Sequence, residues 1–147
     1  MDTTVINGIT VTPLKRIHHP QGDVYHALKS SEASFRGFGE AYFSTVLFSN
    51  IKGWKKHSQM TLNLVVPLGA IRFVVYDDRV SSSTLGKFFD ITLSSDNYCR
   101  LTVAPGLWMA FQGRDENNLN LLLNLASIEH NPAEAITTKL DEFKYEW

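Results

Sequence analysis

The segment Ile51–His57 combines three lysines and a histidine between two strand-like apolar stretches. Alternate residues share a face of an extended strand, so Lys55 and His57 would lie on one face, with Lys52 and Trp54 on the other. Proton abstraction beside a carbonyl needs this pairing, because the imidazole takes the proton and the cation stabilises the enolate oxygen. The segment therefore indicates a catalytic pair, Lys55 and His57. The alternative is a solvated basic edge strand, which the spacing alone favours.

Several polar residues in apolar surroundings are candidates for binding a substrate. Arg72 interrupts an apolar strand, where it could clamp a phosphate or pair with a carboxylate such as Asp77. Trp108 and Gln112 would share a strand face and could stack on a base or sugar, although core packing is the alternative for Trp108. Asn124 lies in an apolar run, where its amide needs hydrogen-bond partners if it is buried.

Metal ligands are sparse along the chain. A metal site inside a small β-barrel would need two histidines two residues apart on one strand, a carboxylate and a later third histidine. The segment around Lys55 offers only His57, and the third position falls near Met109, a poor ligand for such a site. His18 and His19 are adjacent and would point to opposite faces of a strand. We therefore expect no bound metal.

Short runs rich in Val, Ile, Phe, Tyr and Thr, separated by turn residues, are the elements that must position these groups. Many short strands at this spacing are typical of a β-sandwich or β-barrel. Besides Ile51–His57 and a strand after Pro105-Gly106, the predicted strands are Thr4–Val11, Val24–Leu28, Glu40–Phe48, Leu62–Val66, Ala70–Tyr76, Phe88–Leu93, Leu101–Val103 and Leu119–Ile128.

The segment Pro132–Leu140 is predicted to form a short helix, with Asn131 as its N-cap and Pro132 at its first position. Two strands, Leu62–Val66 and Phe73–Val75, are apolar on both faces, which implies a second layer. A homodimer packed sheet to sheet is the natural explanation, and a monomer whose own chain covers both faces is the alternative.

Length and composition predict one domain spanning residues 1–147. The net charge of −1 provides no general attraction to nucleic acid or to an anionic membrane, so neither partner is expected. The single cysteine, Cys99, cannot form an internal disulfide, and the N-terminal residues lack the apolar run of a secretion signal. We therefore expect a cytoplasmic protein.

The stretch Ser94–Phe111, with its Ser-Ser-Asp-Asn turn and Ala-Pro-Gly-Leu-Trp-Met-Ala-Phe segment, resembles the dTDP-4-dehydrorhamnose 3,5-epimerase family. Upstream of this stretch, Gly69–Arg79 and then Leu85–Phe89 resemble two further motifs of that family. Ser44 and Ile51–Trp54 resemble another of its segments. The closing Tyr145-Glu146-Trp147 is also similar. The resemblance covers most of residues 20–147.

This resemblance implies a dimeric, cupin-type jelly-roll β-barrel that needs no metal or organic cofactor. Family members invert carbons beside the ketone of a nucleotide-linked 4-keto-6-deoxy sugar, with a histidine base, a lysine that stabilises the enolate and a tyrosine that returns a proton. In this sequence the histidine position holds Lys55, and His57 follows two residues later. The lysine, tyrosine and second histidine positions fall near Leu62, near Asn124 and on Met109.

Two hypotheses follow from the resemblance. In the first, the protein is an isomerase or epimerase of a nucleotide-linked keto sugar in surface-polysaccharide synthesis, with His57 as base and Lys55 or Lys52 as cation. Ser44, Arg72, Trp108, Gln112 and Asn124 would then bind the substrate, and Asp141 is a candidate to orient His57. In the second, the protein keeps the epimerase fold but only binds a sugar nucleotide or a protein partner.

Overall fold

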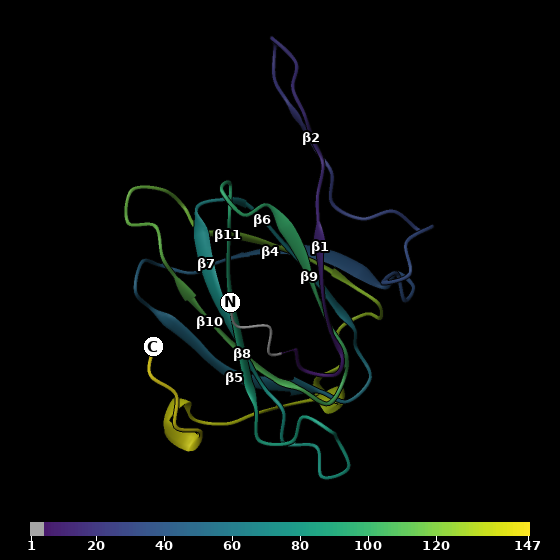
Figure 1. Cartoon of the computed structure of the whole chain (residues 1–147), viewed down its shortest axis with the longest axis vertical. Helices are drawn as coiled ribbons and strands as arrows, with labels where there is room; N and C mark the ends of the chain where they lie inside the picture. The colour runs from purple at the N-terminus through teal and green to yellow at the C-terminus, as the bar shows by residue number, and fades with distance from the viewer. Residues whose placement is uncertain (1–4) are drawn as a thin grey trace.

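The computed structural model describes residues 5–147 as two five-stranded antiparallel sheets that face each other, together with a small two-stranded hairpin (Figure 1). The strand order is β1-β9-β6-β11-β4 in the first sheet and β12-β5-β10-β7-β8 in the second. The strands are β1 (Ile9–Pro13), β2 (Arg16–Ile17), β3 (Val24–Tyr25), β4 (Glu40–Thr45), β5 (Ile51–His57), β6 (Leu62–Leu68), β7 (Ala70–Tyr76), β8 (Phe88–Ser94), β9 (Cys99–Val103), β10 (Trp108–Gly113), β11 (Leu121–Ala126) and β12 (Ala135–Thr137).

The predicted all-β fold is confirmed, and most predicted strands are found within a few residues of their expected bounds. The first strand begins at Ile9, later than predicted, and Thr4 lies outside the described residues. The Val24–Leu28 prediction is correct only for Val24 and Tyr25, which pair with β2 in the small hairpin.

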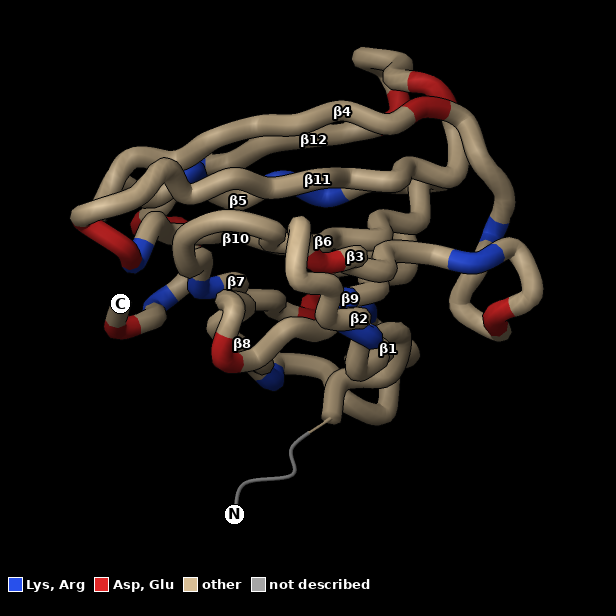
Figure 2. The backbone as a smooth tube through the Cα atoms, turned by 90° about the horizontal axis from the view of Figure 1, so that it is seen from above, with Lys and Arg blue, Asp and Glu red and all other residues tan. Residues whose placement is uncertain are grey.

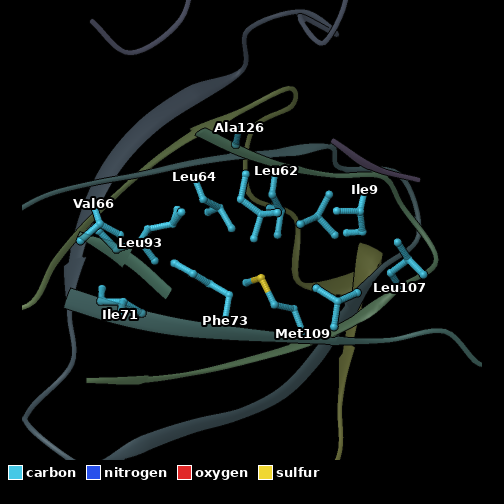
Figure 3. Packing of buried hydrophobic residues seen from close by; sticks show 14 of the residues in the cluster. Ile9, Leu62, Leu64, Val66, Ile71, Phe73, Leu93, Leu107, Met109 and Ala126 are labelled. Carbon is cyan, nitrogen blue, oxygen red and sulfur yellow. The ribbon is translucent and has the colours of Figure 1, made fainter. Parts of the chain in front are cut away.

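Apolar side chains from the inner faces of the two sheets meet between them (Figure 3). Leu62 and Leu64 of β6 face Phe73 of β7 and Met109 of β10, and all four belong to one buried cluster. This packing follows from the period of two along each strand, which sends every second residue into the space between the sheets.

The predicted helix over Pro132–Leu140 is wrong. Asn131 does cap a turn, since its side chain accepts a hydrogen bond from Ala133 N, but that turn is a three-residue 3₁₀ segment, η1 (Pro132–Glu134). The chain then forms β12, which pairs with β5, and a second 3₁₀ segment, η2 (Leu140–Glu142). The N-cap signal is local, and pairing with β5 outweighs the tendency to continue a helix.

The C-terminal residues cover the outer face of the second sheet. Phe143 lies edge-on to Trp54, with 5.4 Å between ring centroids, and the Trp54 indole N–H donates to the Leu140 carbonyl. Val74 of β7 is buried in the same cluster, so the chain itself provides the second layer predicted for Phe73–Val75. On this face the chain's own residues provide the cover that the apolar pattern requires. The full outer aromatic cluster consists of Trp54, Val74, Trp108 and Ala110, with Ile51, Tyr76, Phe88, Phe143, Tyr145 and Trp147 against them.

On the outer face of the first sheet, the fully buried Arg100 holds down the loop that precedes β4. Its guanidinium donates to the Glu32 carboxylate, with Nη2 and Oε2 2.8 Å apart, and to the Ala27 carbonyl. Its Nε donates to the Asn63 side chain of β6. Because a buried cation must be paired, this network fixes the loop against β6 and β9.

The hairpin of β2 and β3 extends away from the two sheets (Figure 1). Acidic and basic positions are interspersed along the backbone in the view of Figure 2. Within residues 5–147, no helix has both the length and the apolar character needed to cross a membrane.

Candidate active site

A pocket of about 270 Å³ lies between the two sheets. Lys52, Lys55 and Tyr42 are exposed while lining it, so the pocket opens to solvent on their side. Its lining combines polar groups with the apolar inner faces of the strands: Tyr42, Ser44, Lys52, Gly53, Lys55, His57, Leu62, Leu64, Met109, Phe111, Leu122 and Asn124.

His57, at the end of β5, is 8% exposed and is held by a buried carboxylate. Its Nδ1 lies 2.6 Å from Oε1 of Glu134, which is itself 5% exposed. The other carboxylate oxygen, Oε2, accepts the backbone N–H groups of Gln59 and Met60 at 3.0 and 2.9 Å. With Nδ1–H donated to a carboxylate, the neutral imidazole carries its free lone pair on Nε2.

Glu134 is ionised at neutral pH. Burial raises the pKa of its carboxyl, but the hydrogen bonds from His57, Gln59 and Met60 together outweigh burial and hold that pKa below its ordinary value. A carboxylate opposite Nδ1 fixes the tautomer and the orientation of the ring and stabilises the imidazolium that forms when Nε2 takes a proton. His57 is therefore arranged as a base on the wall of the pocket.

A β-bulge in β5 brings Lys52 into the same pocket as Lys55 and His57. Met109 and Phe111 of β10 are two residues apart, but their partners on β5, Lys55 and Lys52, are three residues apart. The extra residue reverses the alternation, so Lys52 does not share the outward face with Trp54 as regular spacing predicts. Its Nζ lies 5.9 Å from the centre of the Phe111 ring. The β5 wall thus carries two cations and a base.

The opposite wall, formed by β4 and β11, is polar but uncharged. Tyr42 and Asn124 are directly paired across the two strands, and the Asn124 Nδ2 donates to the Tyr42 hydroxyl at 2.9 Å. Ser44 lies two residues after Tyr42 and also lines the pocket. A ligand in this space would lie between a cationic, basic wall and a wall of hydrogen-bonding groups.

The structure brings together Lys52, Lys55, His57, Ser44 and Asn124 among the predicted site residues. The other three lie on the far side of the second sheet or at its end. Arg72 donates to Asp90 at 2.7 Å and to the Tyr145 hydroxyl, and Trp108 belongs to the outer aromatic cluster. Gln112 donates to the Ser49 carbonyl and accepts from Arg114. Alternation along β10 explains this placement, since Met109 and Phe111 take the pocket-facing positions.

Two residues of the site were missed from the sequence. The carboxylate that binds His57 is Glu134 rather than Asp141, and it lies 77 positions from the histidine, so no local spacing signals it. Tyr42 could have been found, because it shares a strand face with Ser44 at a spacing of two. Among residues 5–147, no three His, Cys, Asp or Glu side chains are grouped closely enough to hold a metal ion.

Neither a protein-family model nor a curated protein matches the sequence. Solved structures do match. A dTDP-sugar isomerase from Desulfovibrio desulfuricans G20 is 36% identical over 93% of this chain and 87% of that one, with a TM-score of 0.89. The chain belongs to the family of dTDP-sugar isomerases and dTDP-4-dehydrorhamnose 3,5-epimerases.

Two further solved structures resemble the chain in fold. A dTDP-4-dehydrorhamnose 3,5-epimerase from Sulfolobus tokodaii is 20% identical, with a TM-score of 0.83 over 94% of this chain and 81% of that one. ChmJ, a 3'-monoepimerase from Streptomyces bikiniensis solved with dTDP-quinovose, is 18% identical, with a TM-score of 0.81 over 93% and 72%. The predicted family and its cupin-type jelly roll are thereby confirmed.

The positions that the sequence resemblance matched to the family's functional residues converge in this structure. Lys55, Leu62, Met109 and Asn124 come from four strands, and all four line the pocket between the sheets. The positions that the resemblance implies for the family's functional residues therefore fall together in this chain, on the walls of one pocket.

Replacing Glu134 by Gln should destabilise the fold in a pH-dependent way. A carboxyl whose pKa is lowered by folding contributes stability above its unfolded pKa, near 4.5, and that contribution is lost as the pH falls through the folded value. We expect E134Q to lower the free energy of unfolding by about 1–3 kcal/mol at pH 7. The difference from wild type should shrink below pH 4.5.

Urea unfolding of both proteins between pH 3 and pH 8 measures this difference. Glu142→Gln, which changes an exposed carboxylate in η2, is the matched control and should have little effect at any pH. A cost of E134Q that stays constant across the pH range would show that Glu134 does not act as a buried carboxylate.

Proposed function

We propose that this protein is an isomerase or epimerase that abstracts a proton beside the ketone of a nucleotide-linked 4-keto sugar. One observation carries the proposal: an imidazole fixed by a buried carboxylate lines the same pocket as Lys55. The similar protein from Desulfovibrio desulfuricans G20 is described as a dTDP-sugar isomerase, which supports a dTDP-linked substrate.

The proposed chemistry needs only protein side chains. Nε2 of His57 removes the hydrogen from the carbon next to the ketone, and the C–H electron pair becomes the C=C bond of an enolate. The carbonyl π pair moves onto oxygen, where Lys55 stabilises the negative charge. When the C=O bond re-forms, the C=C pair takes a proton, and His57 releases its own proton to solvent.

Tyr42 supports a route for returning a proton from the opposite wall. Its hydroxyl oxygen accepts a hydrogen bond from Asn124, which leaves the O–H free to donate into the pocket. A proton taken by His57 from one face and returned by Tyr42 to the other inverts the carbon. The phenolate then regains a proton from solvent, so the side chains end in their starting states.

The proposed roles of His57 and Lys55 can be tested by the rate of deuterium incorporation. With dTDP-4-keto-6-deoxyglucose in D₂O, wild type should incorporate deuterium beside the ketone, and mass spectrometry measures the rate. His57→Gln should slow incorporation by about 10²–10⁴-fold, and Lys55→Met by about 10²–10³-fold.

Lys56→Met is the matched control for Lys55→Met. Lys56 is the next residue on the same strand but lies on the outer face, where its Nζ pairs with Asp78 at 3.2 Å. Its removal should leave incorporation within a few-fold of wild type. No incorporation by wild type with dTDP-, UDP- or GDP-linked 4-keto sugars would refute the proposed reaction.

Replacing Tyr42 by Phe should separate exchange from inversion. His57 would still remove the proton and return solvent deuterium to the same face, so incorporation should stay within about tenfold of wild type, whereas inversion should fall by about 10²–10⁴-fold. Proton NMR of the product measures inversion alongside incorporation. Thr45→Ser, on the outer face of β4, is the control. If Tyr42→Phe slowed incorporation and inversion by the same factor, Tyr42 would have a structural role and would not be the group that returns the proton.

We also propose that the protein is a homodimer. The β2–β3 hairpin exposes Ile17 and Val24, and a two-stranded ribbon is only marginally stable without further packing. A second copy that covers these side chains would supply that packing. Sedimentation equilibrium should give twice the 16.6 kDa chain mass, and Ile17→Lys should weaken the association. A monomer at micromolar concentration would contradict this proposal.

We further propose that the protein is located in the cytoplasm. The single cysteine, Cys99, is a free thiol, which suits a reducing compartment. Nucleotide-linked sugars are the donors from which glycans are assembled. We therefore propose that the protein acts in the synthesis of sugars for surface polysaccharide.

A further inference from the structure

One buried polar atom on the neutral wall of the pocket has no partner. Asn124, in β11, is only 2% exposed, and its Nδ2 donates to Tyr42. Its Oδ1 accepts no hydrogen bond from any of the described residues, 5–147. A buried carbonyl oxygen without a donor is unfavourable, and folded proteins rarely leave one in this state without a functional reason.

A neighbouring asparagine shows that this part of the chain can satisfy a buried amide completely. Asn120, also 2% exposed, accepts at Oδ1 from the backbone N–H groups of Ala70 and Asp115. Its Nδ2 donates to the carbonyls of Val46 and Asp115. Asn120 is therefore a structural residue with all its hydrogen bonds made, whereas Asn124, which lines the pocket, has one buried acceptor left unpaired.

Tyr42 determines which end of the amide remains available. Because its hydroxyl accepts from Nδ2, the Asn124 carbonyl is the unpaired end of the side chain, and Asn124 itself lines the pocket. The cations of the site, Lys52 and Lys55, come from the opposite sheet. A hydroxyl group of a bound molecule could supply the missing donor, and on the uncharged wall a neutral hydroxyl suits an amide oxygen.

We propose that Asn124 determines substrate specificity, its Oδ1 accepting a hydrogen bond from one hydroxyl group of the bound sugar. This inference rests on the proposed function for the class of substrate. It assigns the sugar's hydroxyl-bearing edge to the β4–β11 wall and its ketone to the β5 wall. A sugar that lacks this hydroxyl leaves the buried oxygen unpaired, which is the condition under which binding sites discriminate most strongly.

Calorimetry with substrates that cannot react tests this assignment. The probes are dTDP-quinovose, which has no ketone, and its 2-deoxy, 3-deoxy and 4-deoxy analogues. Wild type should bind the 2-deoxy or the 3-deoxy analogue about 10- to 100-fold more weakly than the parent compound. The hydroxyl that the 4-deoxy analogue lacks takes the place of the ketone, which the proposal assigns to the β5 wall. Asn124→Leu, of similar volume, should bind the analogue that wild type binds weakly and the parent with equal affinity.

Two controls separate loss of the acceptor from damage to the pocket. Asn124→Asp keeps an acceptor oxygen and should retain the preference for the parent compound. All three proteins should bind dTDP alone with similar affinity, because dTDP carries no sugar to reach Asn124.

The inference is overturned if wild type binds the 2-deoxy and 3-deoxy analogues as tightly as the parent, if none of the probes binds, or if Asn124→Leu keeps the full preference. The first of these outcomes needs only wild type, so it decides the matter even if a variant does not fold. None of the probes reacts, and the result is therefore independent of turnover. A protein that incorporates deuterium but shows no role for Asn124 retains the proposed function and loses this inference.

Discussion

The hydrogen bond between His57 and Glu134 is the contact on which the site depends. It joins the end of β5 to a 3₁₀ turn 77 residues later, and the pairing of β12 with β5 holds the two together. Burying a carboxylate is costly unless its oxygens are satisfied, and the backbone N–H groups of Gln59 and Met60 complete that requirement. The pairing of β12 with β5 keeps the chain extended after this turn, which is also why a helix does not form there.

The two sheets contribute different kinds of side chain to the pocket. The bulge in β5 collects Lys52, Lys55 and His57 on one wall, while β4 and β11 present the uncharged Tyr42 and Asn124 on the other. The outer aromatic cluster packs against the far side of β5, β7 and β10. This packing supports the backbone of β5, which carries Lys52, Lys55 and His57 on the pocket wall.

The sequence predicts the fold well because strand period and turn residues are local signals. Alternation also places Lys55 and His57 on one face correctly, but it cannot show the bulge that moves Lys52, because a bulge depends on pairing with β10. The pairing of Glu134 with His57 could not be predicted for a similar reason, since the two residues are distant in sequence. From the sequence, Arg72 and Trp108 are candidates for binding a substrate, whereas in the structure both pack with the C-terminal segment.

The tautomer of His57 is the most direct test of this account. Long-range ¹H–¹⁵N NMR of histidine-labelled protein, at a pH where the imidazole is neutral, distinguishes a protonated ring nitrogen from one with a free lone pair. The account predicts that Nδ1 carries the proton, donated to Glu134, and that Nε2 is free to act as a base. A proton found on Nε2 instead would leave the pocket without its base and contradict the central claim.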